Sequence, residues 1–176
     1  MSDSPPPAER LTRRLLHEGR IFDLVHDEVR LASGLTQELD LVLHPGAVAI
    51  APRLEDGRFV CVRQYRHALE ELVLEFPAGR LELNEDPLEA AKRELAEETG
   101  FAAATWTSLG EVWIAPGWAT ERIHLFLAED LDKLATPPAA DDDEEIYLEE
   151  HDADSLFHST SDAKTLVALA RIERRP

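Results

Sequence analysis

The sequence has little cysteine and no long apolar run. Its one cysteine, Cys61, cannot form a disulfide within the chain, and its apolar neighbours are typical of a small core residue. No apolar stretch approaches the roughly 20 residues that span a bilayer. The polar, proline-rich start, residues 1–10, lacks the apolar centre of a signal peptide. We therefore expect a cytoplasmic protein with no membrane partner.

Basic residues are also scarce, with 18 lysines and arginines against 36 acidic residues and a formal net charge of -18. A general nucleic-acid binder usually carries a basic surface, so we expect no nucleic-acid partner. The acidic excess has two interpretations. It forms a solvated surface, or part of it concentrates divalent cations that an enzyme needs when it acts on an anionic phosphate compound.

Length and composition predict one main domain with a small appendage. The chain has 176 residues, of which 44% are hydrophobic, enough for a sizeable core. We expect residues 1–18 to be a flexible N-terminal segment. Short apolar runs at 21–25, 29–31 and 39–43, with a turn at Gly34, predict a β region over residues 19–45. Residues 46–176 form the predicted main domain.

Within the main domain, strand and helix patterns alternate, which predicts a mixed α/β sandwich. Residues 47–51 and 58–65 flank the turn sequence Glu55-Asp56-Gly57, a pattern typical of a hairpin. Further strands are expected at 72–76, 105–113, 123–128 and 146–148. Helices are expected at about 87–99 and 162–172.

The first of these helices carries unusual acidic crowding. Asp86 is a good N-cap and Gly100 a natural C-terminal stop. Glu94, Glu97 and Glu98 lie at i, i+3 and i+4, so their side chains share one patch and repel one another. A hard divalent cation such as Mg²⁺, which prefers several oxygen ligands, would offset that repulsion. The alternative is an ordinary charged face in solvent.

The segment Gly79 to Phe101 resembles the Nudix box. It contains Gly79, then five residues, Glu85, then seven residues, and then the run 93–101, Arg-Glu-Leu-Ala-Glu-Glu-Thr-Gly-Phe. From average residue usage, a chance match in this chain is on the order of one in ten million. The resemblance implies an α/β/α sandwich around a mixed sheet, with a small N-terminal antiparallel sheet. It also implies hydrolysis of a nucleoside diphosphate linked to another group X.

The same resemblance implies roles for individual residues. Glu94 and Glu98 would be the main ligands of Mg²⁺ (or Mn²⁺), and Glu97 a further ligand with a catalytic role. The carbonyl of Ala78 would also reach a metal ion, and Arg93 would orient the carboxylates. Glu85 would be a secondary ligand or a structural support.

Over residues 17 to 172 the chain resembles the ADP-ribose pyrophosphatase branch of this family. The signals are the runs 63–66, 75–79 and 116–121, with Pro116 lying 16 residues beyond Gly100. The acidic run 141–145 resembles a loop that supplies a catalytic base or a further metal ligand. Glu144 is the first candidate for that role, followed by Asp142 and Glu145. A solvated acidic loop is the alternative.

Other residues are candidates for substrate contacts. Arg63 and Arg66 could clamp phosphate oxygens, because guanidinium groups match phosphate geometry; the alternative is exposed strand cations. Phe22 and Trp118 could stack on adenine, or could belong to the core. The remaining candidate substrate contacts are Pro116 and Glu121.

The expected reaction is conversion of ADP-ribose to AMP and ribose 5-phosphate. The alternatives are another nucleotide sugar, such as GDP-mannose or ADP-glucose, or a dinucleotide. A non-catalytic Nudix-fold sensor is a further alternative, although this chain keeps all the box carboxylates. A calcium-binding protein is disfavoured, because the Asp-x-Asp-x-Asp-Gly loop is absent from the sequence. The resemblance also implies a homodimer through the N-terminal β region.

Overall fold

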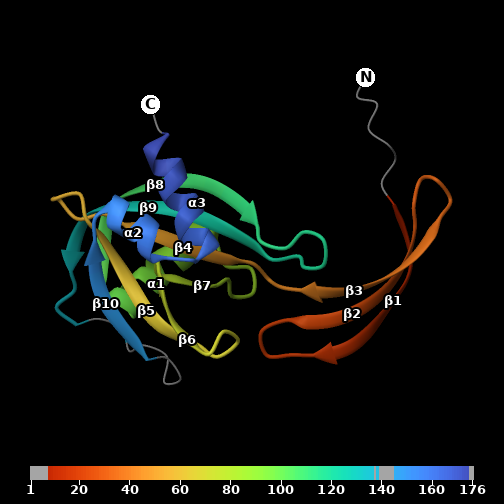
Figure 1. Ribbon diagram of the computed structural model, residues 1–176. Coiled ribbons are helices and arrows are strands. Elements are labelled where there is room, and N and C mark those ends of the chain that lie inside the picture. The colour runs from red at the N-terminus through yellow and green to blue at the C-terminus, as the bar shows by residue number, and fades with distance from the viewer. Residues whose placement is uncertain (1–7, 137, 139–144, 175–176) are drawn as a thin grey trace. The chain divides into compact units, whose positions relative to one another are not determined.

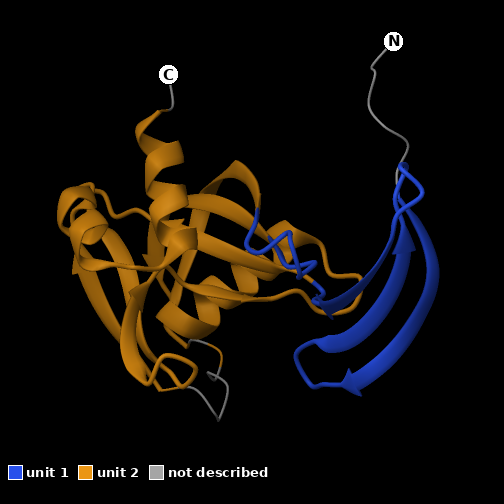
Figure 2. Cartoon of the chain, turned by 45° about the vertical axis from the view of Figure 1, so that its right-hand side comes forward, with its two compact units in different colours: residues 1–45, 113–122 blue, residues 46–112, 123–176 orange. Residues whose placement is uncertain are grey.

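The computed structural model describes residues 8–136, 138 and 145–174, which fall into two compact units (Figure 2). Unit 1 consists of Met1–Pro45 and Trp113–Arg122, and unit 2 of Gly46–Val112 and Ile123–Pro176. Assignment of residues 113–122 to unit 1 was not expected. No helix among the described residues is long and apolar enough to cross a membrane.

Unit 1 is a three-stranded antiparallel sheet with the order β1-β2-β3. Its strands are β1 (Glu9–Glu18), β2 (Asp23–Arg30) and β3 (Thr36–Leu43). The loop 113–122 joins this unit through backbone hydrogen bonds to β3. The Val42 amide donates to the carbonyl of Trp118 at 2.8 Å, and the Thr120 amide donates to the carbonyl of Val42 at 2.9 Å. These bonds explain why the loop belongs to unit 1.

The N-terminal segment differs from the sequence expectation, because residues 9–18 form strand β1 rather than a flexible tail. Nearly all side chains of β1 are exposed, so its sequence lacks the apolar alternation that identifies a half-buried strand. Its pairing depends on β2 instead. Arg13 binds Asp27 of β2 with two hydrogen bonds of 2.6 and 2.7 Å. Strand β2 is also continuous where two short strands were expected.

The described residues of unit 2 form two sheets and three helices, whose arrangement is drawn in Figure 1. A four-stranded sheet has the order β7-β4-β9-β8, and a three-stranded sheet the order β10-β5-β6. Strand β4 pairs antiparallel with β7 and parallel with β9, so the larger sheet is mixed, as expected. The elements are β4 (Ala47–Pro52), β5 (Phe59–Arg66), β6 (Glu71–Glu75), β7 (Ala78–Arg80), α1 (Pro87–Thr99), β8 (Phe101–Trp113), β9 (Arg122–Lys133), β10 (Ile146–His151), α2 (Ala153–Ser159) and α3 (Ala163–Glu173).

Strand β4 lies at the centre, with all six residues buried. Its side chains alternate between two apolar clusters, as the two-residue period of a strand requires. Val48 and Ile50 pack with Ala90, Ala91 and Leu95 of α1. On the other face, its three alanines pack with residues from the smaller sheet and from helices α2 and α3. The main sheet therefore lies between helices, as the predicted α/β/α sandwich requires.

The expected hairpin between residues 47–51 and 58–65 is wrong. The turn is present, with the Gly57 amide donating to the carbonyl of Leu54 at 3.0 Å. However, β4 and β5 belong to different sheets and share only the bridge between Arg53 and Phe59. Because β4 is buried on both faces and already has β7 and β9 as neighbours, no edge remains for β5 to pair with.

Helix α1 forms over the residues that its capping signals predicted. The Asp86 side chain accepts hydrogen bonds from the amides of Leu88 and Glu89. At the other end, Gly100 adopts the left-handed conformation with φ 71°. The last predicted helix is also present as α3, with Asp162 as its N-cap. Helix α2 was not anticipated from the sequence.

Candidate active site

Helix α1, which carries Glu94, Glu97 and Glu98, lies close to strand β7. Strand β7 is held against β4 by pairing of Gly79 with Val48 and of Ala78 with Ala49. The carboxyl group of Glu94 lies directly over Gly79. A Cβ atom at position 79 would lie only 1.9 Å from the carboxyl carbon of Glu94. Glycine is thus required here because the side chain of Glu94 fills the space of a Cβ.

Arg93 is the centre of the charged cluster on this helix. Its Nε and Nη2 atoms donate to the two carboxylate oxygens of Glu85, both at 3.0 Å. Its Nη1 atom donates to Glu94 at 2.7 Å and to Glu97 at 3.0 Å. One guanidinium therefore holds three carboxylates at once, with the fork geometry that suits arginine.

The contacts of Arg93 also shift the pKa values of Glu85 and of Arg93 itself. The hydrogen bonds from Arg93 hold the pKa of the Glu85 carboxyl below its ordinary value. The same contacts with Glu85, followed by those with Glu94 and Glu97, raise the pKa of the Arg93 guanidinium. Glu85 is therefore an anion at neutral pH, and it can anchor the arginine in the folded chain.

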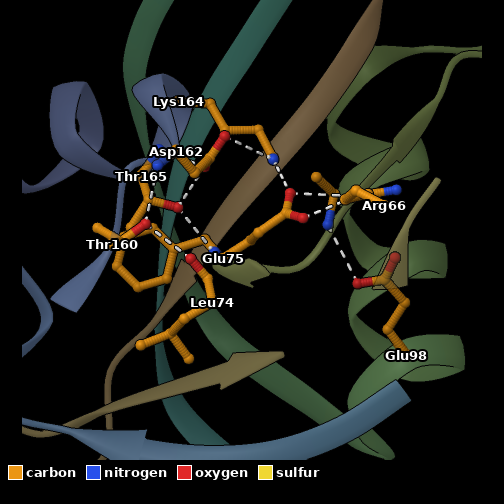
Figure 3. Close-up of polar contacts among 10 residues, drawn as sticks. Arg66, Leu74, Glu75, Glu98, Thr160, Asp162, Lys164 and Thr165 are labelled. Carbon is orange, nitrogen blue, oxygen red and sulfur yellow. Dashed lines mark hydrogen bonds and ion pairs between the residues drawn. The ribbon is translucent and has the colours of Figure 1, made fainter. Parts of the chain in front are cut away.

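Glu98 lies one turn further along the same face of the helix as Glu94. Its Oε2 atom accepts a hydrogen bond of 3.1 Å from the backbone amide of Ala78. Figure 3 shows the guanidinium of Arg66 lying between the carboxyl groups of Glu98 and Glu75. Arg66 comes from the end of β5, so strands β5 and β7 both reach the carboxylate of Glu98.

Glu75 is a buried carboxylate with two cationic partners (Figure 3). Its side chain is only 3% exposed. Arg66 donates to both of its oxygens, at 2.6 and 3.0 Å, and Lys164 of α3 makes a further ion pair with it. Burial alone would raise the pKa of Glu75, but the hydrogen bonds from Arg66 and the charge of Lys164 outweigh burial and lower it. Glu75 is therefore ionised.

Arg63, the second predicted phosphate contact, binds a different partner. It donates to Glu149 of β10 through Nε at 2.5 Å and through Nη2 at 3.1 Å. His151 also contacts Glu149 at 2.9 Å. The hydrogen bonds from Arg63, and next those with His151, lower the pKa of Glu149 to about 2. The guanidinium groups of both Arg63 and Arg66 are thus held by carboxylates of their own unit.

The chemistry of this surface suits a hard divalent cation, since carboxylate oxygens are its preferred ligands. In this structure Arg93 contacts one oxygen each of Glu94 and Glu97, and the Ala78 amide contacts one oxygen of Glu98. Among residues 8–136, 138 and 145–174, no group of three or more His, Cys, Asp or Glu side chains is placed to hold a metal ion.

The remaining predicted site residues lie elsewhere. Phe22, Pro116 and Trp118 are exposed residues of unit 1, and Glu121 is partly buried there. Phe22 and Trp118 are 42% and 58% exposed, so neither packs into a core of this chain. Glu145 is exposed and accepts a hydrogen bond from Tyr147. The first two candidates for the base, Asp142 and Glu144, lie outside the described residues.

Sequence reasoning assigned no role to Glu75, Lys164 or Glu149. One signal was present for the first of these. Glu75 lies next to Phe76 within the apolar run 72–76. This setting favours burial of its carboxylate near the turn that leads to Gly79. A buried carboxylate requires a cation, but the partner from α3 is 89 residues away in sequence, and no local pattern identifies it.

Comparisons with known proteins identify the family and the fold. The NUDIX domain matches residues 42–169. The ADP-ribose pyrophosphatase of Bacillus subtilis is 36% identical over 168 residues, covering 93% of this chain and 91% of that protein. The methanol dehydrogenase activator of Bacillus methanolicus is 37% identical over 163 residues, covering 90% and 88%. The crystal structure of an ADP compounds hydrolase superposes with a TM-score of 0.85 at 24% identity, covering 98% and 95%.

The domain match spans well over half of the chain, so this protein belongs to the NUDIX domain family. The structural likeness confirms the expected fold. Its retained box and its relatives make it a Nudix hydrolase.

Proposed function

We propose that this hydrolase cleaves the diphosphate of ADP-ribose to give AMP and ribose 5-phosphate, and that the charged surface of α1 is its catalytic platform. One observation carries the assignment to this surface. Arg93 gathers Glu85, Glu94 and Glu97 beside Gly79, where the chain leaves no room for a Cβ. The choice of ADP-ribose is supported by the similarity to the Bacillus subtilis pyrophosphatase over nearly the whole of both chains.

Glu94 and Glu98 are the proposed main metal ligands, with Glu97 and the carbonyl of Ala78 as further ligands. When bound there, a Mg²⁺ or Mn²⁺ ion would neutralise the diphosphate and lower the pKa of a coordinated water. Arg93 contacts two of these proposed ligands, Glu94 and Glu97. It holds the carboxylates of Glu94 and Glu97 close together, which their mutual repulsion would otherwise oppose.

Other residues would bind the substrate and move the proton. Arg66 and Arg63 are proposed to contact phosphate oxygens, as are Phe22, Pro116, Trp118 and Glu121 to contact the rest of the substrate. An acidic side chain between positions 142 and 145, with Glu144 first, is the proposed base that takes a proton from the attacking water. In-line attack on one phosphorus atom then breaks the bridging P–O bond.

A second candidate substrate is another nucleoside diphosphate linked to a sugar or a nucleotide, because the box motif does not determine the group X. We also propose that the enzyme works as a homodimer in the cytoplasm. The support is the exposed apolar surface of unit 1, including Leu15, Leu16 and Ile21. Light scattering coupled to size-exclusion chromatography tests the dimer. A monomer at micromolar concentration would contradict it.

The activity is tested by screening phosphate release from a panel of nucleoside diphosphate derivatives, with Mg²⁺ or Mn²⁺ and a coupled phosphatase. We expect ADP-ribose to have the highest kcat/KM. Glu98→Gln should lower kcat by a factor on the order of a hundred or more, because it removes a proposed ligand. Glu89→Gln, on the exposed first turn of the same helix, is the matched control. A Glu98→Gln variant as fast as this control would contradict the proposed site.

A further inference from the structure

The buried ion pair between β6 and α3 lies next to the catalytic platform. Glu75 accepts hydrogen bonds from Arg66, and Lys164 binds the same carboxylate from the other side. Lys164 is itself largely buried and also contacts Asp162 at 3.0 Å. Asp162 caps α3 through the amide of Thr165 at 2.9 Å. The N-terminus of α3 therefore fixes the position of Lys164, and Lys164 fixes that of Glu75.

Glu75 and Glu98 lie on opposite sides of the same guanidinium (Figure 3). An arginine between two carboxylates divides its hydrogen bonds and its charge between them. Because Glu75 is buried and holds two nitrogens of Arg66, it offers the guanidinium a strong partner in a fixed position. Glu98 is more accessible, and any cation that binds its carboxylate competes with Arg66 for it.

We propose that Glu75 is a positioning residue that limits how strongly Arg66 pairs with Glu98, so that the Glu98 carboxylate remains available to a divalent cation. The inference rests on the proposed function, in which Glu98 is a metal ligand. Lys164 opposes this effect of Glu75 on Arg66. It shares the Glu75 carboxylate with Arg66, and it thereby limits how strongly Glu75 withdraws the guanidinium.

The proposal predicts opposite effects for two substitutions in one ion-pair cluster. In Glu75→Gln, Arg66 loses its buried charged partner and pairs more strongly with Glu98, so the affinity for Mn²⁺ should fall by about tenfold or more. In Lys164→Met, the whole charge of Glu75 acts on Arg66, and Mn²⁺ should bind at least as tightly as in the wild type. A purely structural role would weaken binding in both variants.

The experiment is calorimetric titration of Mn²⁺ into the full chain without substrate, with circular dichroism to verify folding. Glu89→Gln and Lys92→Met are charge-matched controls on the exposed face of α1. A third variant, Arg66→Met, remains informative if Glu75→Gln does not fold. It removes the competing cation, so Mn²⁺ should bind at least as tightly as in the wild type, and adding Glu75→Gln to it should have no further effect on the affinity.

Each result decides between the alternatives. Weaker Mn²⁺ binding in Glu75→Gln than in Glu89→Gln, with no weakening in Arg66→Met, supports the proposal. Unchanged binding in Glu75→Gln, or weaker binding in Arg66→Met, overturns it while the proposed function stands. If the wild-type chain bound no Mn²⁺ and hydrolysed no diphosphate, the proposed function would fail, and this inference would fail with it.

Discussion

Replacing Gly79 with alanine tests whether the position of one carboxylate controls catalysis. The backbone of Gly79 lies outside the left-handed region, so alanine fits its conformation. The new methyl group would instead meet Glu94, at 1.9 Å from its carboxyl carbon, where real Cβ contacts essentially never fall below 3.0 Å. The carboxylate must therefore move by about 1 Å or more.

The expected cost to stability is small and the expected cost to catalysis is large. The displaced group is the end of a flexible side chain, and its ion pair with Arg93 is worth about 1 kcal/mol or less. The melting temperature should thus change by only about 2–4 °C. A misplacement of about 1 Å at a reacting centre can lower the rate by about a hundredfold. That factor corresponds to about 2.7 kcal/mol of transition-state stabilisation.

The assay is kcat/KM for ADP-ribose, with the melting temperature measured in parallel. Adding Gly79→Ala to Glu94→Gln provides the decisive comparison, because two changes that act through the same carboxylate should not be additive. A Gly79→Ala variant with nearly wild-type kcat/KM would refute the reasoning. A melting temperature lowered by far more than a few degrees would refute it too, by showing that the strand moves rather than the side chain.

Three further predictions concern other parts of unit 2. Thr165→Val should lower the free energy of unfolding by about 1–3 kcal/mol in urea titrations, because the buried Thr165 hydroxyl accepts the Phe76 amide at 2.8 Å and valine leaves this donor unpaired. Glu149 has its pKa lowered to about 2, so its pair with Arg63 contributes stability above the ordinary pKa of 4.5 and loses it as the pH falls toward 2. In Glu149→Gln, the melting temperature should lose the part of its decrease between pH 4.5 and 2 that this pair causes. An unchanged profile would contradict the prediction. Burial raises the pKa of Cys61 to about 12, so the thiol should resist alkylation at pH 8 in the folded protein and react once urea unfolds it.

Local signals in the sequence were sufficient to predict the helix that carries the platform. Asp86, Pro87 and Gly100 act within a few residues of the helix ends, so helix α1 has the predicted bounds. The spacing of the three glutamates also placed them on one surface. Recognition of the family was confirmed because the box is long and specific.

Features that depend on distant residues could not be predicted in the same way. The pattern of β4 and β5 was that of a hairpin, but the sheet in which each strand lies is decided by pairing with β9 and β10. Strand β1 has no apolar alternation and depends on the pairing of Arg13 with Asp27. Lys164, one of the two partners of Glu75, and Glu149, the partner of Arg63, likewise come from the last quarter of the chain.

The parallel pairing of β4 with β9 has a consequence for how the protein is made. Ala47 pairs with Ile123 and Pro52 with Ala128, so the two strands enclose a long loop that contains β7 and the whole of α1. Closing so long a loop costs chain entropy before the contact can form, and such pairings fold slowly. During synthesis, residues beyond 128 must therefore leave the ribosome before β4 and β9 can pair in the four-stranded sheet. Until then, the apolar face of α1 has only part of its core to pack against. A translation arrest before that point would leave a fragment prone to aggregation.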